Sequence, residues 1–561
     1  VEALGDVFDF YIWSGTPREA MTAYGTLTGL PIFPPEWVFE PWAGGGGGRW
    51  RNGPLQDIAL EQMAAMKKFH ELDIPHSGFY AEGAGATFYG EYKKEELYKV
   101  VSFGERHGFK VFSWQFPNMT QELAQELLPE CPKEELPITR NKNDEEEKLP
   151  VYIDFSHPRA KELLAAQWKD RMDAGIRGSM VDFGDVVPDE AVFYDGRRGD
   201  EMHNAYAYQY AKNYRELFEQ KYGDDHVLYT RGAAPGSQHF ACQFGGDQLT
   251  SFQGLKYAIA GGLSAAASGL PFWGVDAGGY DGFPDQETYL RWTEYAAFCP
   301  LMRFHGTEPR EPWEYDAFTV KVYRYYTWLR ENLRPYIVSV AAEAHKLGIP
   351  MMRPLAMMYP EDQEATKVWD EYLFGEDLLV APVSDETEER EIYFPEGRWI
   401  SLWNLNDEIS GPVQRSVEVP IDKIPVYIRE GSFLPLRLNE SLKLGESMSE
   451  SETEMILAVV PQNDSIVKET LYERSGAKTC CGMEKNGETI QLQISGRTAE
   501  LYVMLAGIHW KNTEAIVNGR TLTKVTAREG LYFTEGYLEL EEGILVKINP
   551  SAESVIKIQK K

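Results

Sequence analysis

The stretch Ile176-Arg-Gly-Ser-Met-Val-Asp-Phe-Gly-Asp185 decides the fold of this chain. Its part Gly178–Phe183 is short and apolar, which is typical of a buried strand. The segments before and after it, Pro158–Ala174 and Ala205–Tyr222, are predicted to be helices. A strand set between helices of 10–20 residues indicates right-handed βαβ units and therefore a parallel sheet.

The same alternation runs from about residue 31 to residue 360, which predicts a closed (β/α)8 barrel rather than an open sheet. We place the barrel at residues 28–360, with an inserted loop or subdomain at about 118–150, where an acidic run interrupts the pattern. The other strands predicted in this region are Pro75–Glu82, Lys110–Phe116, Val227–Arg231 and Phe272–Val275, and the other helices are Gln56–Leu72 and Gly254–Ser268.

Both flanks of the barrel are predicted to be β-structure. Beyond residue 360, short runs rich in Val, Ile and Tyr alternate with turn residues, among them Arg390–Phe394 and Trp399–Trp403. We expect a proximal C-terminal β-domain at 361–438 and a distal β-sandwich at 439–561. Residues 1–27, with apolar runs at Phe8–Trp13 and Ala20–Leu27, are expected to be the remnant of a truncated N-terminal β-sandwich. The fold class is therefore α/β, a TIM barrel flanked by β-domains.

Composition excludes several classes of partner. With 56 Lys+Arg against 87 Asp+Glu, the net charge of −31 argues against nucleic acid and anionic membranes. The uncharged stretch Tyr257–Val275 is rich in Gly, Ala and Ser, and we expect a buried helix leading into a strand there rather than a membrane span. Five cysteines without a CxxC pair predict neither a disulfide framework nor structural zinc, which favours the cytoplasm. The composition does not decide whether the chain forms a homo-oligomer.

Chemistry in such a barrel lies where the strands end, at the carboxyl-terminal face. The predicted strand ends and the segments just beyond them carry Glu82, Trp114, Asp182, Arg231, Asp247, Asp276 and His305. Carboxylates, cations and aromatic rings around one opening fit glycoside hydrolysis, in which two carboxyl groups flank the scissile bond. The separation of the carboxyl groups decides between retention and inversion, and the sequence gives no distance.

The order and spacing of several motifs resemble glycoside hydrolase family 31, the retaining α-glycosidases. The resemblance covers nearly the whole chain. The motifs are Pro34-Pro-Glu-Trp37, Asp154-Phe-Ser-His-Pro158, Val181-Asp-Phe-Gly-Asp185, Met202-His-Asn-Ala-Tyr206, Gly245-Gly-Asp247, Trp273-Gly-Val-Asp-Ala-Gly-Gly-Tyr280, Arg303-Phe-His-Gly306, Met351-Met-Arg-Pro354 and Leu373–Val383.

The resemblance implies a role for each candidate residue. Asp182 would be the nucleophile that forms a covalent glycosyl-enzyme, and Asp247 the general acid/base. A neighbouring cation such as Arg231 would lower the pKa of the nucleophile and keep it ionised. In the family, residues matching Arg231, Asp276 and His305 hold sugar hydroxyls, while those matching Trp114, Phe244 and Trp273 line the walls of the pocket. The family needs no metal ion or cofactor.

Two departures from the family pattern concern substrate choice. Glu82 stands where the family usually has an Asp, and Gln115-Phe116 follows Trp114 where the family usually has Ile-Asp or Ile-Asn. The motifs around Asp182 and Met202 are most similar to the α-xylosidase branch. We therefore expect an exo-acting enzyme on small α-xylosides or α-glucosides.

Three alternatives remain. Sulfoquinovosidases share the Asp-Phe-Gly signature, but the segment Gly83–Tyr92 contains no Arg to bind a sulfonate. A transglycosylase would share the first half-reaction. A carbohydrate-binding protein with an inactive barrel is the non-enzymatic alternative, and the presence of both Asp182 and Asp247 argues against it.

Overall fold

The computed structural model describes residues 11–45, 55–85, 92–140, 151–449, 454–463, 465–497, 499–532 and 534–561. The chain divides into two compact units. The first contains Val1–Tyr289, Leu301–Ala317 and His345–Ile349, and the second contains Leu290–Pro300, Phe318–Ala344 and Pro350–Lys561.

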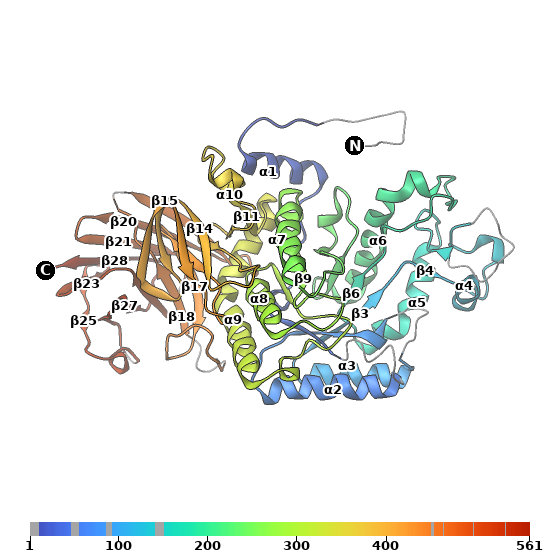
Figure 1. Cartoon of the computed structure of the whole chain (residues 1–561), viewed down its shortest axis with the longest axis horizontal. Coiled ribbons are helices and arrows are strands. Elements are labelled where there is room, and N and C mark those ends of the chain that lie inside the picture. The colour runs from blue at the N-terminus through green and yellow to red at the C-terminus, as the bar shows by residue number, and fades with distance from the viewer. Residues whose placement is uncertain are drawn as a thin grey trace. The chain divides into compact units, whose positions relative to one another are not determined.

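The first unit contains the predicted barrel (Figure 1). Among the described residues, eight parallel strands close in the order β1-β10-β9-β8-β7-β6-β3-β2. They are β1 (Trp42–Gly45), β2 (Gly78–Ala81), β3 (Lys110–Gln115), β6 (Gly178–Val181), β7 (Val227–Thr230), β8 (Cys242–Phe244), β9 (Trp273–Asp276) and β10 (Leu301–Arg303). The residues of β2, β6, β7 and β9 are buried throughout, as expected of strands that are covered on both faces.

Helices lie between most successive strands of the barrel. The sequence predicted α2 (Leu55–Glu71), α5 (Ala160–Ala174), α6 (Gly199–Tyr222) and α7 (Phe252–Ala267). It did not predict α3 (Lys94–Arg106), α8 (Gln286–Ala297) or α9 (Ala317–Leu347), which follows the last strand of the barrel. Local signals set their ends: the Ser251 hydroxyl accepts a hydrogen bond from the Gly254 amide at the start of α7. Gly175, with φ of 103°, ends α5 in the left-handed conformation that favours glycine.

The prediction of β-structure at Ala20–Leu27 is wrong. This segment belongs to helix α1 (Pro17–Thr28), which begins with a capping box. The Thr16 hydroxyl accepts from the Glu19 amide, and the Glu19 carboxylate accepts from the Thr16 amide. These bonds favour a helix over the β-structure that was expected for this apolar run. Residues 1–10, including the first part of the predicted strand Phe8–Trp13, lie outside the described residues.

The insertion expected at about 118–150 contains a small hairpin and one short helix. Strand β4 (Asn118–Met119) pairs antiparallel with β5 (Val151–Tyr152), and α4 (Gln121–Leu127) lies between them in sequence. Residues 141–150 are outside the described range.

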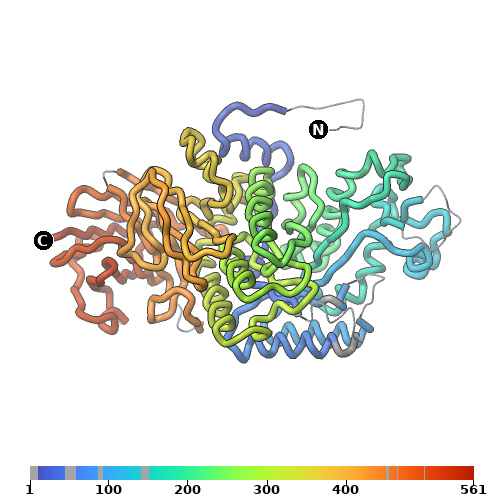
Figure 2. Tube along the Cα trace, viewed as in Figure 1, coloured from blue at the N-terminus to red at the C-terminus, as the bar shows by residue number. Residues whose placement is uncertain are grey.

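The second unit contains the C-terminal sheets, coloured yellow to red in Figure 2. One sheet has the order β11-β12-β13-β16-β14-β15. Its strands are β11 (Met352–Pro354), β12 (Tyr372–Phe374), β13 (Leu378–Val380), β14 (Glu389–Ser401), β15 (Asn404–Glu418) and β16 (Val426–Arg429). The separate strands predicted at 390–394 and 399–403 are one strand, β14, interrupted by a bulge between Phe394 and Gly397.

Two further six-stranded sheets form the distal part, as predicted. Their orders are β17-β18-β22-β27-β26-β25 and β19-β20-β21-β28-β23-β24. The strands are β17 (Phe433–Leu438), β18 (Glu454–Val459), β19 (Ile466–Tyr472), β20 (Lys478–Asn486), β21 (Thr489–Ser495), β22 (Leu501–Ala506), β23 (Thr513–Val517), β24 (Arg520–Thr521), β25 (Thr523–Lys524), β26 (Gly536–Glu539), β27 (Gly543–Ile548) and β28 (Glu553–Lys560). Ile490, Leu492 and Ile494 alternate inward along β21 into a core shared by both sheets. The domain boundaries at 28, 361 and 439 stay predictions.

The uncharged stretch at 257–275 forms the second part of helix α7 and most of strand β9, a helix leading into a strand as expected. Within the described residues, no helix combines the length and hydropathy that a membrane span requires.

Candidate active site

Asp182 lies at the end of β6 and is only 4% exposed. The Trp114 indole Nε1 donates a hydrogen bond of 3.0 Å to its Oδ2, and the Phe183 amide donates one of 2.8 Å to its Oδ1. Phe183 adopts a φ of +56°, a left-handed conformation that is uncommon for a bulky residue. This strained turn follows the carboxylate directly, and such strain is concentrated at functional sites.

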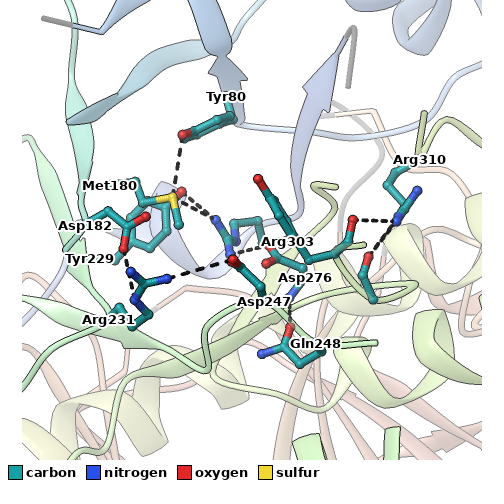
Figure 3. A network of polar contacts seen from close by, with 12 residues as sticks. Tyr80, Met180, Asp182, Tyr229, Arg231, Asp247, Gln248, Asp276, Arg303 and Arg310 are labelled. Atoms are coloured by element: carbon teal, nitrogen blue, oxygen red, sulfur yellow. Dashed lines mark hydrogen bonds and ion pairs between the residues drawn. The ribbon is translucent and has the colours of Figure 1, made fainter. Parts of the chain in front are cut away.

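Arg231, which follows β7, bridges the two predicted catalytic carboxylates (Figure 3). Its Nε lies 3.2 Å from Oδ1 of Asp182, and its Nη1 lies 3.9 Å from Oδ2 of Asp247. The guanidinium also lies 4.2 Å from the centre of the Phe183 ring, a cation–π contact that holds it over the strained turn. The structure therefore brings together Asp182, Asp247 and Arg231, as predicted.

Arg231 lowers the pKa of Asp182, as predicted, but the net shift of that pKa is upward. Burial raises the pKa above the ordinary value, and the opposing effects of Arg231 and of the Trp114 hydrogen bond do not fully offset that burial. The sequence identified the cation correctly, but it does not show how deeply the carboxylate is buried.

Asp247 has a different environment. It follows β8 after Gly245 and Gly246, and its side chain is 48% exposed. A Cβ at position 245 would lie 2.6 Å from Gln248 Nε2 and 2.8 Å from the Trp273 ring, and Gly246 has a φ of +77°. The tight space at Gly245 and the positive φ of Gly246 both require glycine, and this turn leaves the Asp247 side chain half exposed.

Asp276, the last residue of β9, is fully buried and forms an ion pair with Arg303 at the end of β10. Its burial raises its pKa to about 7, because the attraction of Arg303 offsets only part of the desolvation of the carboxylate. Apart from this ion pair, neither carboxylate oxygen has a hydrogen-bond partner among the described residues. A buried carboxylate with unused acceptor capacity is suited to bind hydroxyl groups.

Arg303 is positioned by Phe244, which the sequence singled out, and by Tyr229, which it did not. Its Nη1 donates to the Tyr229 hydroxyl at 2.7 Å, and its guanidinium lies over the rings of Tyr229 and Phe244. Tyr229 comes from β7 and Phe244 from β8, so this cluster depends on the register of neighbouring strands. Register could not be obtained from the sequence. In the sequence, only the position of Arg303 two residues before His305 indicated that Arg303 belongs to the site.

The predicted wall residues also surround this region. Trp273 and Phe244 are buried, and a Cβ on Gly245 would meet the Trp273 ring. The His305 ring is 4.4 Å from that of Tyr80 and 5.5 Å from that of Tyr280, centre to centre. His305 is thus held between two aromatic rings.

A second arginine fixes the loop after β9. Arg310 is buried and donates hydrogen bonds to the carbonyls of Gly279, Tyr280 and Gly282. These bonds fix the backbone that follows Asp276. The sequence gave no sign of this role, since Arg310 lies outside the strands.

Glu82 opens the short 3-10 helix η3 (Glu82–Ala84), directly after β2. Its side chain lies outside the described part of the chain, so its predicted role stays a prediction. No group of three or more His, Cys, Asp or Glu side chains in the described ranges is arranged to hold a metal ion.

Comparison with known proteins identifies the family. A model described as the glycosyl hydrolases family 31 TIM-barrel domain matches residues 32–340, more than half of the chain. The chain belongs to glycoside hydrolase family 31. A second model, the glycosyl hydrolase family 31 C-terminal domain, matches residues 348–434.

Relatives within the family carry several names. The chain is 27% identical to an isomaltosyltransferase of Sporosarcina globispora, in a match that covers 97% of this chain and 54% of the relative. It is also 27% identical to an α-xylosidase of Emericella nidulans, covering 78% of this chain and 58% of the relative. The chain thus matches little more than half the length of these curated relatives.

A solved structure confirms the fold. The cycloalternan-forming enzyme from Listeria monocytogenes, in complex with a pentasaccharide substrate, superposes with a TM-score of 0.86 at 23% identity. The match covers 97% of this chain and 56% of that one.

Proposed function

We propose that this family 31 enzyme is a retaining, exo-acting α-glycosidase in which Asp182 is the nucleophile and Asp247 the general acid/base. The observation that carries the proposal is the single guanidinium of Arg231 placed within 4 Å of both carboxylates. Two carboxyl groups that face one cation from different strands can flank a glycosidic bond.

The two side chains differ as the two roles require. Asp182 is buried and held by three donors, from Trp114, Phe183 and Arg231, so it is fixed for attack on the anomeric carbon. Asp247 is half exposed, where an aglycone and later a water molecule can reach it.

The reaction proceeds in two displacements. An Asp182 carboxylate oxygen forms a bond to the anomeric carbon, while the bond to the leaving oxygen breaks and Asp247 gives that oxygen its proton. Asp247 then removes a proton from water, whose oxygen displaces Asp182 and restores the carboxylate. The sugar keeps its α configuration.

For the substrate, we propose α-glucosides or α-xylosides cut at the non-reducing end. The names of the Sporosarcina and Emericella relatives support these two sugars. Buried Asp276 and His305, with Arg303 behind them, supply the polar groups for the hydroxyls of the sugar.

Transglycosylation is a second candidate. The match to an isomaltosyltransferase extends over 97% of this chain, and transfer uses the same glycosyl-enzyme with a sugar hydroxyl in place of water. Disaccharide formation that outpaces release of free sugar in the presence of an acceptor would favour transfer.

A panel of aryl α-xyloside, α-glucoside, α-galactoside and sulfoquinovoside tests the proposal. We expect turnover of the first two, and preferred cleavage of the sulfoquinovoside would establish that alternative instead. Asp182→Ala should abolish turnover. Azide should restore the Asp247→Ala variant and yield an α-glycosyl azide, because the small anion attacks the glycosyl-enzyme without needing a general base.

Asp189→Ala is the matched control, because Asp189 is an exposed carboxylate on the same loop as Asp182. Unchanged turnover of Asp182→Ala would overturn the enzymatic assignment and favour the inactive, sugar-binding alternative.

A further inference from the structure

A groove of about 370 Å³ lies in the proximal C-terminal sheet, within the second unit. It is bordered by the long strand β15, by the segment 420–425 and by the start of β16. Volumes of this size are typical of small-molecule sites. None of its lining residues belongs to the site built around Asp182.

The floor of the groove is apolar and partly aromatic. Ile409 and Val417 are an even number of residues apart on β15, so both lie on one face of that strand. Trp403 and Tyr427 complete the lining; Tyr427 is 5% exposed and belongs to the core of the sheet, so the partly exposed Trp403 is the aromatic ring that a ligand can reach. The Trp403 indole donates a hydrogen bond of 2.6 Å to the Ile424 carbonyl, which fixes the orientation of its ring.

The rim of the groove carries charged side chains of both signs. Asp407 and Glu418 are exposed carboxylates, and Arg415 and Lys423 are exposed cations. Within the described part of the chain, none of these four side chains has a hydrogen-bond or ion-pair partner, although many other charged side chains in this unit are paired. The rim therefore has donors and acceptors available to a ligand.

These features select a neutral ligand. The two carboxylates and two cations cancel, so the rim attracts neither an anion nor a cation strongly, and the net charge of −31 further disfavours anions. A sugar has C–H faces that pack on aromatic rings and hydroxyls that both donate and accept hydrogen bonds.

We propose that this groove is a non-catalytic binding site for a neutral oligosaccharide. The Trp403 ring contacts the face of a sugar ring, and the rim side chains bind the hydroxyls. Such a site would keep the protein on a carbohydrate chain between rounds of cleavage.

The test uses the full chain carrying Asp182→Asn, so that bound sugar is not turned over. Isothermal titration with isomaltotetraose, maltotetraose and cellotetraose measures the number of binding events. We expect at least one of these probes to bind to this chain, and the double change Asp407→Ala/Arg415→Ala to weaken one binding event at least ten-fold. This change leaves the net charge as it was and alters exposed side chains, so folding should be unaffected.

The matched control is Glu95→Ala/Lys99→Ala, a charge-neutral change of two exposed residues on α3. It should leave every binding event in place. Binding that is equal in the groove variant and the control, or no binding of any probe, would overturn the proposal.

The double change Asp407→Ala/Arg415→Ala, made in the otherwise wild-type chain, should not alter kcat on a small aryl glycoside. A fall in kcat would contradict a non-catalytic role for the groove. Because titration reports binding without turnover, its result is independent of whether the proposed reaction is observed.

Discussion

The indole nitrogen of Trp114 donates a hydrogen bond of 3.0 Å to the carboxylate of Asp182. The bond joins the ends of two neighbouring strands, β3 and β6. It orients a buried carboxylate that has lost most of its contact with water, and it favours the ionised form.

Trp114→Phe removes this hydrogen bond but keeps an aromatic ring beside Phe116. A hydrogen bond to a charged group contributes about 1.5–3 kcal/mol, so kcat/KM should fall by about 10- to 100-fold. Steady-state kinetics on an aryl α-glycoside measures the effect. Trp369→Phe, at an exposed tryptophan, is the control and should leave kcat/KM unchanged.

Arg231→Met should move the acid limb of the pH profile of kcat/KM to higher pH. Arg231 lowers the pKa of Asp182, so its removal raises a pKa that burial has already raised. The carboxylate must be ionised to attack, and kcat/KM follows the ionisation of the free enzyme. Arg197→Met, at a half-exposed surface arginine, should not move the limb. An unmoved limb in Arg231→Met would mean that another group controls it.

Asp276→Asn should change how stability depends on pH. The pKa of Asp276 is about 7 in the folded protein and about 3.9 in an unfolded chain, so the folded state binds more protons between these values. Stability contributed by this residue is present below about pH 4 and is lost as the pH rises toward 7. The Asn variant has no such loss, so its stability relative to the wild type should rise by at least about 1 kcal/mol between pH 4.5 and pH 7.5. Urea unfolding at a series of pH values measures it, and a constant difference would contradict the raised pKa.

Gly178→Ala should destabilise the barrel. A Cβ there would lie 2.4 Å from the Val227 carbonyl oxygen, which is backbone of the adjacent strand and has little room to move. Overpacking of this kind costs about 1–3 kcal/mol. Gly261→Ala is the matched comparison, because it lies in α7 with nothing within 4 Å of its Cβ position, and it should stabilise by up to about 1 kcal/mol. Thermal unfolding of both variants distinguishes the two effects.

The sequence predicted the barrel and the positions of its main polar residues, because strand ends in a parallel barrel meet at one face. It missed β1, β8 and β10. The strands β8 and β10 have three residues each and are too short to show a period, and β1 contains two glycines, which weaken a strand pattern. Helix α1 was assigned wrongly from its composition, although Thr16 and Glu19 carry a capping signal that could have been recognised.

Within the site, the sequence identified individual residues and the pairing of Arg231 with Asp182, but not the contacts of Arg303. The contacts of Arg303 with Asp276 and Tyr229 join three strands and follow from register. The raised pKa of Asp182 follows from its depth in the fold. Neither register nor depth is encoded in local spacing.

The bonds from Arg310 to the carbonyls of Gly279, Tyr280 and Gly282 hold this loop through its main chain rather than through its own side chains. Substitutions at neighbouring exposed positions such as Phe283 should therefore alter the surface without rerouting the backbone. The loop is therefore a place where exposed side chains can be diversified while the backbone after Asp276 keeps its course.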